Sequence, residues 1–129
     1  MTPDVAAISS ILTAMPSVEL AYVFGSLARG CARPDSDADV AVLASAPLDP
    51  NTRIALVEEL ATATGRAIDL IDLSTAGEPL LGQVLHHGIR VKGSDTLHAQ
   101  LVTKHIFDTE DFLPYVQRML EERRKSWIV

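Results

Sequence analysis

Two short polar motifs, each lying next to an apolar run, constrain this chain more than any other feature. Gly25-Ser26 follows one apolar run, and after ten further residues Asp37-Ala38-Asp39 opens a second one. An apolar run that enters a Gly-Ser turn predicts a strand leading into a phosphate-binding corner. Because side chains alternate along a strand, Asp37 and Asp39 should lie on one face. A divalent cation would relieve their repulsion, so the two motifs together predict a metal and nucleotide site.

A third carboxylate occurs in a similar apolar setting further along the chain. Asp69 lies within the β-like run 67–73, among isoleucine and leucine residues, where burying an unpaired acid is costly. A strand here, beside the strand that begins at Asp37, would bring Asp69 into a cluster of three carboxylates. Asp72 competes for this role, but it is offset by three residues and should point to the opposite face. We therefore expect Asp69 to complete the cluster.

The remaining pattern alternates helices and strands and predicts an α/β (α+β) domain. Thr2 caps a first helix, Asp49 caps another, and residues Thr75–Glu78 match a capping box for a third. The expected strands are 18–24, 37–43, 67–73 and 89–92. The expected helices are 3–15, 27–30, 50–64, 75–87 and two over 96–129, with a break near 108–113.

The four histidines and the single cysteine are assigned no part in the chemistry. His86 and His87 are adjacent and should be solvated residues at a helix end, where the helix dipole favours them. His98 and His105 lie seven residues apart on one helical face, away from the acidic motifs. Cys31 has no activating base beside it in the sequence, so a structural or spectator role is expected.

Composition narrows the partners and the compartment. Seventeen Asp and Glu outnumber eleven Lys and Arg, and the net charge of −6 disfavours stable binding of nucleic acid. One cysteine allows no internal disulfide, which favours a reducing compartment. The sequence shows no basic leader and no run of about eighteen apolar residues, which argues against a signal peptide or a membrane span. We therefore expect a cytoplasmic protein that does not associate with membranes.

The spacing of the motifs resembles a known family. Gly25-Ser26, ten residues, Asp37-x-Asp39 and a later strand with Asp69 resemble the minimal nucleotidyltransferases of the polymerase-beta superfamily. More specifically, the chain is similar over residues 18–93 to the MNT-domain antitoxins of HEPN/MNT toxin–antitoxin pairs. The resemblance implies a polymerase-beta-like nucleotidyltransferase fold, a small mixed sheet flanked by helices, over residues 1–94. Residues 95–129 would then form a C-terminal helical extension that packs on the core or on a partner.

The same resemblance implies a set of site residues and cofactors. Two Mg²⁺ ions would be held by the acids, one of them carried in with the ATP substrate. The catalytic and metal-binding residues would be Asp37, Asp39 and Asp69. The nucleotide-binding residues would be Gly25, Ser26, Arg29 and Ser36, with the Gly-Ser pair on the β- and γ-phosphates.

In the resembled antitoxins, AMP is transferred from ATP to a tyrosine hydroxyl of the partner HEPN ribonuclease, which silences that toxin. The resemblance implies the same activity and partner here, in a homodimer or in a larger hetero-oligomer with the toxin. Three alternatives remain open: transfer to a small-molecule hydroxyl, a non-catalytic antitoxin that acts by steric cover, and a structural α/β domain. The apolar pair Trp127-Ile128 is expected to pack on the core or on a partner.

Overall fold

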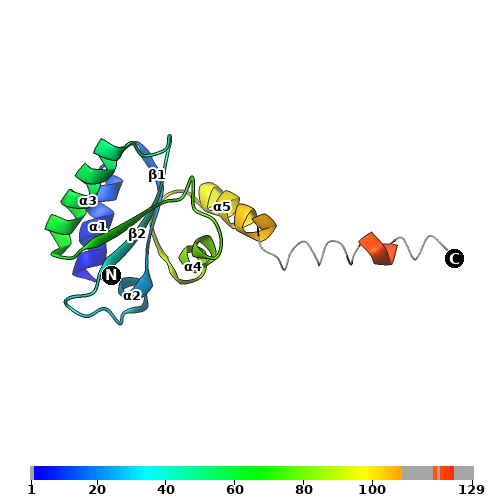
Figure 1. Ribbon diagram of the computed structural model, residues 1–129, viewed down its shortest axis with the longest axis horizontal. Coiled ribbons are helices and arrows are strands. Elements are labelled where there is room, and N and C mark those ends of the chain that lie inside the picture. The colour runs from blue at the N-terminus through cyan, green and yellow to red at the C-terminus, as the bar shows by residue number, and fades with distance from the viewer. Residues whose placement is uncertain (1, 109–117, 119, 124–129) are drawn as a thin grey trace.

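The computed structural model describes residues 2–108, 118 and 120–123. Over residues 3–108, nine elements follow one another, with strands and helices alternating as the sequence predicts. Figure 1 shows how they are arranged. In chain order they are α1 (Pro3–Thr13), β1 (Val18–Phe24), α2 (Gly25–Arg29), β2 (Ala38–Ala44), α3 (Pro50–Thr64), β3 (Ile68–Asp72), α4 (Leu80–His87), β4 (Ile89–Lys92) and α5 (Asp95–Asp108). Most of the predicted break near 108–113 and the pair Trp127-Ile128 lie outside the described residues.

The four strands form one mixed sheet in the order β3-β2-β1-β4. Strand β1 is antiparallel to both of its neighbours, β2 and β4, whereas β2 and β3 are parallel. The parallel pair requires a crossover, and α3 provides it between the end of β2 and the start of β3. The prediction of a small mixed sheet flanked by helices is therefore confirmed.

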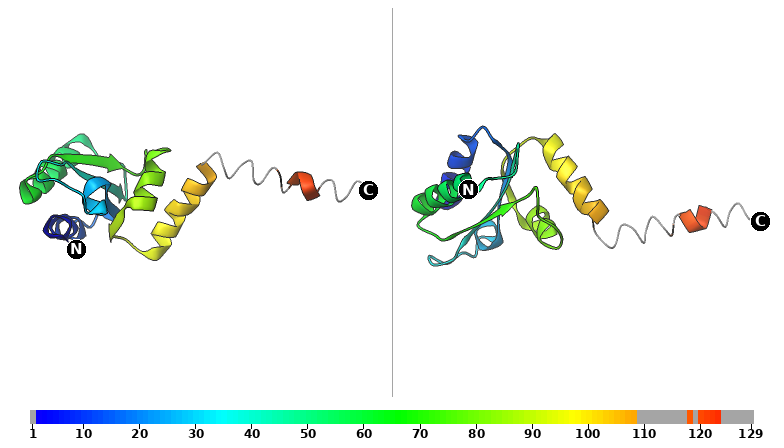
Figure 2. Two further views of the ribbon diagram at one scale, coloured as in Figure 1. Left: turned by 90° about the horizontal axis from the view of Figure 1, so that it is seen from below. Right: turned by 45° about the horizontal axis from the view of Figure 1, so that its top comes forward.

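Helices cover both faces of the sheet and define two apolar layers (Figure 2). Alternate residues of β1 enter opposite layers, since a strand presents successive side chains to opposite faces. The layer under α1 and α3 includes Ile8, Val23, Val40 and Leu60. The layer under α4 and α5 includes Tyr22, Ala41, Leu81 and Leu101. The side of the sheet on which a residue lies therefore decides which pair of helices it faces.

Local signals in the sequence explain where the helices begin and end. The Thr2 hydroxyl accepts a hydrogen bond from the Val5 N–H at 3.3 Å, and α1 starts at Pro3. Asp49 caps α3 in the same way, through a 2.7 Å bond from the Thr52 N–H. These contacts satisfy backbone donors that the first turn of a helix otherwise leaves unpaired.

The predicted capping box at Thr75–Glu78 is wrong, because α4 begins only at Leu80. The Thr75 hydroxyl donates to the Asp72 carbonyl at 3.3 Å instead of capping a following helix. The N–H groups of Thr75 and Ala76 donate to the same carbonyl, so a tight turn occupies this stretch. The predicted start of the second strand at Asp37 is also one residue early, since β2 begins at Ala38.

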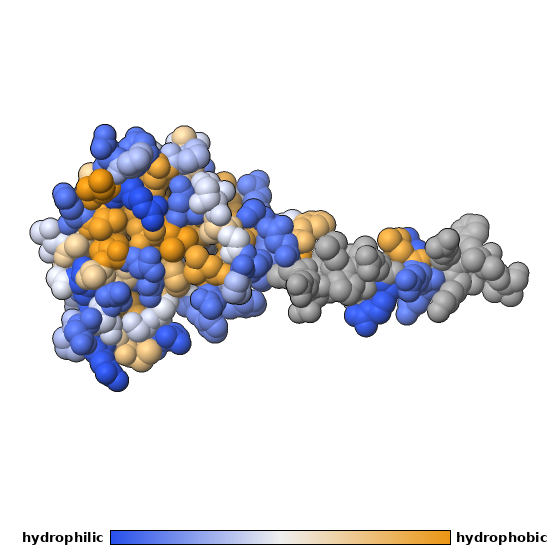
Figure 3. All heavy atoms as spheres, viewed as in Figure 1, coloured by the Kyte–Doolittle hydropathy of each residue, from blue (hydrophilic) through white to orange (hydrophobic). Residues whose placement is uncertain are grey.

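Helix α5 packs its inward face on the sheet and on α4. Leu101 is buried in the layer beneath it, and the Tyr22 hydroxyl lies 2.5 Å from Nδ1 of His98. On the face shown in Figure 3, apolar residues gather over the middle of the described core and polar residues surround them. Among the described residues, no helix is long and apolar enough to cross a bilayer.

Candidate active site

The predicted motifs meet at one end of the sheet, where β1 ends and β2 and β3 begin. Strand β1 ends at Phe24, which pairs with Asp39 on β2, and Asp39 in turn pairs with Asp69 on β3. Gly25 follows Phe24 directly, so the Gly-Ser turn lies at the end of β1, beside the two acids on β2 and β3. The pairing register therefore brings two of the three predicted acids, Asp39 and Asp69, to adjacent positions.

Both acids point toward the α4 side of the sheet. Ala41 and Ile71, two positions further along β2 and β3, pack in the layer under α4 and α5, and side chains two apart share a face. Asp39 is half-buried, whereas Asp69 is exposed. The site therefore has one sheltered carboxylate and one that solvent or a second molecule can reach.

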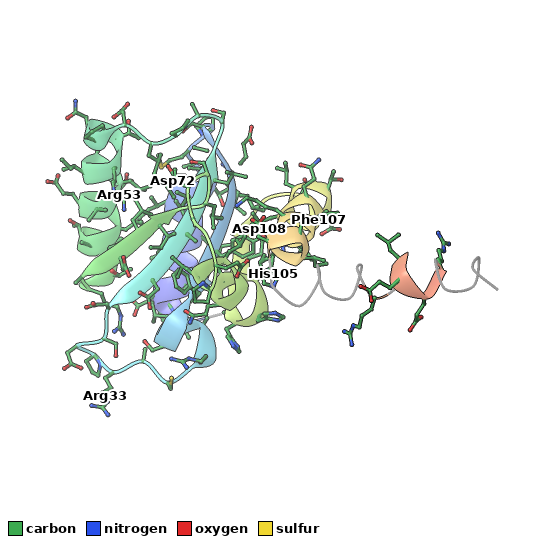
Figure 4. The ribbon with its side chains drawn as sticks, turned by 45° about the vertical axis from the view of Figure 1, so that its right-hand side comes forward. Arg33, Arg53, Asp72, His105, Phe107 and Asp108 are labelled. Carbon is green, nitrogen blue, oxygen red and sulfur yellow. The ribbon has the colours of Figure 1, made fainter. Side chains whose placement is uncertain are left out.

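Asp72 lies on the opposite side and has a structural role. Its carboxylate accepts hydrogen bonds from the Ser74 N–H at 2.9 Å, the Ser74 hydroxyl at 2.7 Å and the Leu48 N–H at 3.2 Å. Burial alone would raise the pKa of Asp72, but these hydrogen bonds and the charge of Arg53 lower it below its ordinary value. Figure 4 labels Asp72 and Arg53 on the α3 side of the sheet. Asp72 thus ties the connector between β2 and α3 to the turn that follows β3, and it faces away from Asp69.

Gly25 is required by the close approach of Asp39. Its φ is +69°, in the left-handed region that glycine adopts without strain. A Cβ atom at this position would lie only 2.1 Å from Oδ2 of Asp39. The missing side chain thus lets the carboxylate of Asp39 lie against the backbone of the turn that begins α2.

The electrostatics of Asp39 show that the three predicted acids interact. Burial raises the pKa of Asp39, the negative charges of Asp69 and Asp37 raise it further, and the charge of Arg29 opposes them. Asp37 itself is exposed and stands one residue before β2. The carboxylates therefore form a site of concentrated negative charge that a cation would stabilise.

The oxygen ligands of these carboxylates fit Mg²⁺ held together with substrate phosphates. No group of three His, Cys, Asp or Glu side chains in the described part of the chain could hold a metal ion by itself. Magnesium is usually held by one or two carboxylates together with substrate phosphates, and it prefers oxygen ligands. The mutual repulsion at Asp39 and the Gly25 turn beside it match that arrangement.

A cavity of about 520 Å³ opens beside the acids. This volume is in the range of sites for small ligands. One wall is formed by the strand ends at this side of the sheet and by α2, and the other wall is formed by α4. The cavity is lined by Phe24, Gly25, Arg29, Asp39, Asp69, Leu80, Gln83 and His87.

The α4 wall was not predicted from the sequence. Leu80, Gln83 and His87 are spaced by three and four residues, so they lie on one helical face. That spacing was the available signal and holds in the predicted helix over 75–87 as well, but a pattern within one segment does not show what the face meets. His87, expected to be a solvated residue at the helix end, is exposed as predicted and also lines the cavity.

Ser36 and Asp37 are positioned by the loop that precedes β2. The Ser36 hydroxyl accepts a hydrogen bond from the Arg33 N–H at 2.8 Å. Arg66 donates through Nη1 to the carbonyls of Arg33 and Ser36, at 2.5 and 2.9 Å, and pairs through Nε with Asp4 at 2.8 Å. Arg66 therefore fixes the backbone immediately before Asp37.

The other residues considered in the sequence have packing contacts. Cys31 is an exposed free thiol, 3.8 Å from the Ser26 carbonyl. His98 contacts Tyr22, and His105 contacts Glu78 at 2.5 Å. Ser26 is half-buried in the first turn of α2, next to Gly25.

Comparison with known proteins agrees with this geometry. The chain belongs to the polymerase beta, nucleotidyltransferase family, whose model matches residues 6–97. It is 39% identical over 80 residues to the protein adenylyltransferase MntA of Shewanella oneidensis. That alignment spans 62% of this chain and 58% of the relative's length.

Solved structures of toxin–antitoxin complexes are similar over nearly the whole chain. A toxin–antitoxin with AMP-PNP matches with a TM-score of 0.69 and 27% identity, covering 98% of this chain and 97% of the other. The tri-AMPylated Shewanella oneidensis HEPN toxin in complex with MNT antitoxin matches with a TM-score of 0.67, 27% identity and the same coverage. The predicted likeness to the MNT antitoxins is therefore confirmed.

Proposed function

We propose that this chain is an Mg²⁺-dependent protein adenylyltransferase that transfers AMP from ATP to a tyrosine hydroxyl of a HEPN-domain toxin and so inactivates it. The observation that carries the proposal is the pairing of Asp39 with Asp69 beside the Gly25 turn, at the edge of a cavity of about 520 Å³. The relatives support the choice of reaction and partner, since one is a protein adenylyltransferase and another is an antitoxin with its AMPylated HEPN toxin.

The nucleotide would lie between the two walls of the cavity. Backbone N–H groups of the turn at Gly25 and the Ser26 hydroxyl bind the β- and γ-phosphates, with Arg29 supplying a positive charge. Asp37 and Asp39 are the residues that would hold Mg²⁺, through their carboxylate oxygens. The complex of a similar toxin–antitoxin with AMP-PNP supports ATP as the donor.

The acceptor hydroxyl would approach from the exposed side, where Asp69 lies. When bound, Mg²⁺ supplies positive charge to the attacking and leaving oxygens of phosphoryl transfer. The tyrosine oxygen forms a bond to the α-phosphorus, the bond to pyrophosphate breaks, and Asp69 accepts the hydroxyl proton. Because Asp69 is exposed while Asp39 is half-buried, a residue carried by another protein can reach it.

The alternative functions explain fewer features of the candidate site. A small-molecule acceptor would need its own binding surface, whereas the similar solved structures are complexes of a toxin with an antitoxin. An antitoxin that acts only by steric cover would have no need for three interacting carboxylates beside a glycine turn. The net charge of −6 supports a protein substrate over a nucleic acid. The exposed free thiol supports a reducing compartment such as the cytoplasm.

The proposal is tested by intact-mass measurement of the HEPN partner after incubation with this protein, ATP and Mg²⁺. The expected result is a gain of one or more AMP units, which is absent with the double variant Asp37→Ala/Asp39→Ala. Asp72→Asn serves as the matched control, since it changes an aspartate on the same sheet that faces away from the cavity. A partner that is inhibited but gains no mass would establish the steric antitoxin instead.

A further inference from the structure

The first turn of α4 is held by a residue outside the helix. Pro79 is the N-cap residue of α4 and makes no side-chain capping bond. Oε2 of Glu78 instead accepts a hydrogen bond from the Gly82 N–H at 3.2 Å. Leu80 and Gln83, which line the cavity, belong to this turn. The position of Glu78 therefore fixes part of the cavity wall.

The second carboxylate oxygen of Glu78 connects α4 to α5. Oε1 lies 2.5 Å from Nδ1 of His105, and the two side chains are only 22% and 16% exposed. A carboxylate oxygen accepts hydrogen bonds, so this contact is a hydrogen bond in the tautomer that carries a hydrogen on Nδ1 of His105. A pair shielded from water to this degree holds its geometry more firmly than a surface ion pair does.

Gly82 permits the approach of α5 to α4. It is buried, and a Cβ atom there would lie 3.0 Å from Cε1 of His105 and 3.2 Å from Oε2 of Glu78. The His105 ring also meets the edge of the His86 ring, with centroids 5.6 Å apart. Figure 4 labels His105 on α5, on the side near α4. Glu78 and His105 thus contact each other and also meet α4 at Gly82 and His86, in the same helix as the cavity-lining Leu80 and Gln83.

We infer that Glu78 and His105 are positioning residues that hold the α4 wall of the nucleotide cavity in place. The inference rests on the proposed function, because it assumes that the cavity binds ATP. Neither residue lines the cavity or touches the acids in the described structure, so neither is catalytic. Since the wall contacts nucleotide before and during reaction alike, its displacement should weaken nucleotide binding and leave the chemical step nearly unchanged.

The test measures AMP-PNP binding by calorimetry with Mg²⁺, AMP transfer to the HEPN partner, and hydrogen exchange of the α4 amides. Glu78→Ala and His105→Ala should raise the Kd for AMP-PNP and the KM for ATP about tenfold, with kcat within about twofold of wild type. Exchange at Gly82 should quicken in both variants. Glu78→Gln keeps an acceptor for Gly82 and should restore binding to within about threefold.

Asp108→Ala is the control, because it removes an ion pair with Lys104 within α5 and leaves the contacts of Glu78 with Gly82 and His105 in place. It should bind AMP-PNP as wild type does. Unchanged Kd and exchange in Glu78→Ala, or a loss in kcat alone, would overturn the inference. A wild-type protein that binds AMP-PNP but transfers no AMP would refute the proposed function, while the binding and exchange data would still decide the role of Glu78.

Discussion

Replacing Gly25 with alanine should separate the stability of the fold from the geometry of the active site. A left-handed φ of +69° costs a residue with a Cβ about 1–2 kcal/mol. The new Cβ would also lie 2.1 Å from Oδ2 of Asp39, which must move by more than an ångström to reach ordinary contact. Because that oxygen is at the end of a side chain, it can rotate away, and the fold survives. A displacement of about 1 Å at a reacting centre can cost about a hundredfold in rate.

Gly30, at the other end of α2, provides the matched control. Its φ is +71°, but nothing lies within 4 Å of the position that a Cβ would occupy. Gly25→Ala and Gly30→Ala should therefore lose similar unfolding free energy, each lowering Tm by roughly 3–8 °C. Only Gly25→Ala should lose AMP transfer, by about a hundredfold in kcat/KM.

Two assays decide the outcome: thermal unfolding without nucleotide, and initial rates of AMP transfer followed by intact mass. If Gly25→Ala transfers AMP within about threefold of wild type, the contact with Asp39 does not govern catalysis. If Gly30→Ala loses as much activity as Gly25→Ala, backbone strain rather than the position of Asp39 explains the loss.

Three further changes test other parts of the site. Asp39→Asn should abolish transfer yet keep or raise Tm at pH 7. Because the pKa of Asp39 is higher in the folded state than in the unfolded state, Asp39 stabilises the fold at pH values below its unfolded-state pKa. This stabilisation is lost as the pH rises through the folded-state pKa. A lower Tm for Asp39→Asn at pH 7 would contradict this expectation. Asp72→Ala should cost about 1–3 kcal/mol in denaturant unfolding, with transfer per folded molecule retained. The lowered pKa of Asp72 stabilises the fold above its unfolded pKa, and this stabilisation disappears as pH falls through the folded pKa, so the variant should show a weaker acid dependence. Arg66→Ala frees the Ser36 carbonyl and should reduce transfer about tenfold; an unchanged rate would show that the loop needs no such anchor.

Much of the fold could be predicted because its signals are local. Thr2 and Asp49 cap their helices through bonds to residues three positions away, and Gly65 ends α3 with a φ of +67°. The capping box at Thr75–Glu78 failed although its residue types were right. Its threonine bonded backward to Asp72, and a sequence pattern cannot tell which of two nearby partners a hydroxyl takes.

The sequence predicted the residues of the candidate site better than it predicted how they are arranged in space. Asp37, Asp39 and the Gly25 turn are close in sequence, and Asp69 was favoured over Asp72 by strand alternation alone. The structure agrees with that choice of faces, because Asp69 pairs with Asp39 while Asp72 binds the Ser74 turn. The roles of these acids in catalysis remain predictions for the experiments above.

The sequence by itself determined the elements, the acids and the turn, because each depends on residues within a few positions of one another. Only the tertiary structure decided that Oδ2 of Asp39 lies against Gly25 and that α4 faces the acids. It also decided that Glu78, just before α4, contacts His105 on α5, 27 positions further along the chain. These contacts depend on the pairing register of the strands and on how the helices pack on the face of the sheet. Periodicity in one segment cannot specify them, since the partner lies in another segment.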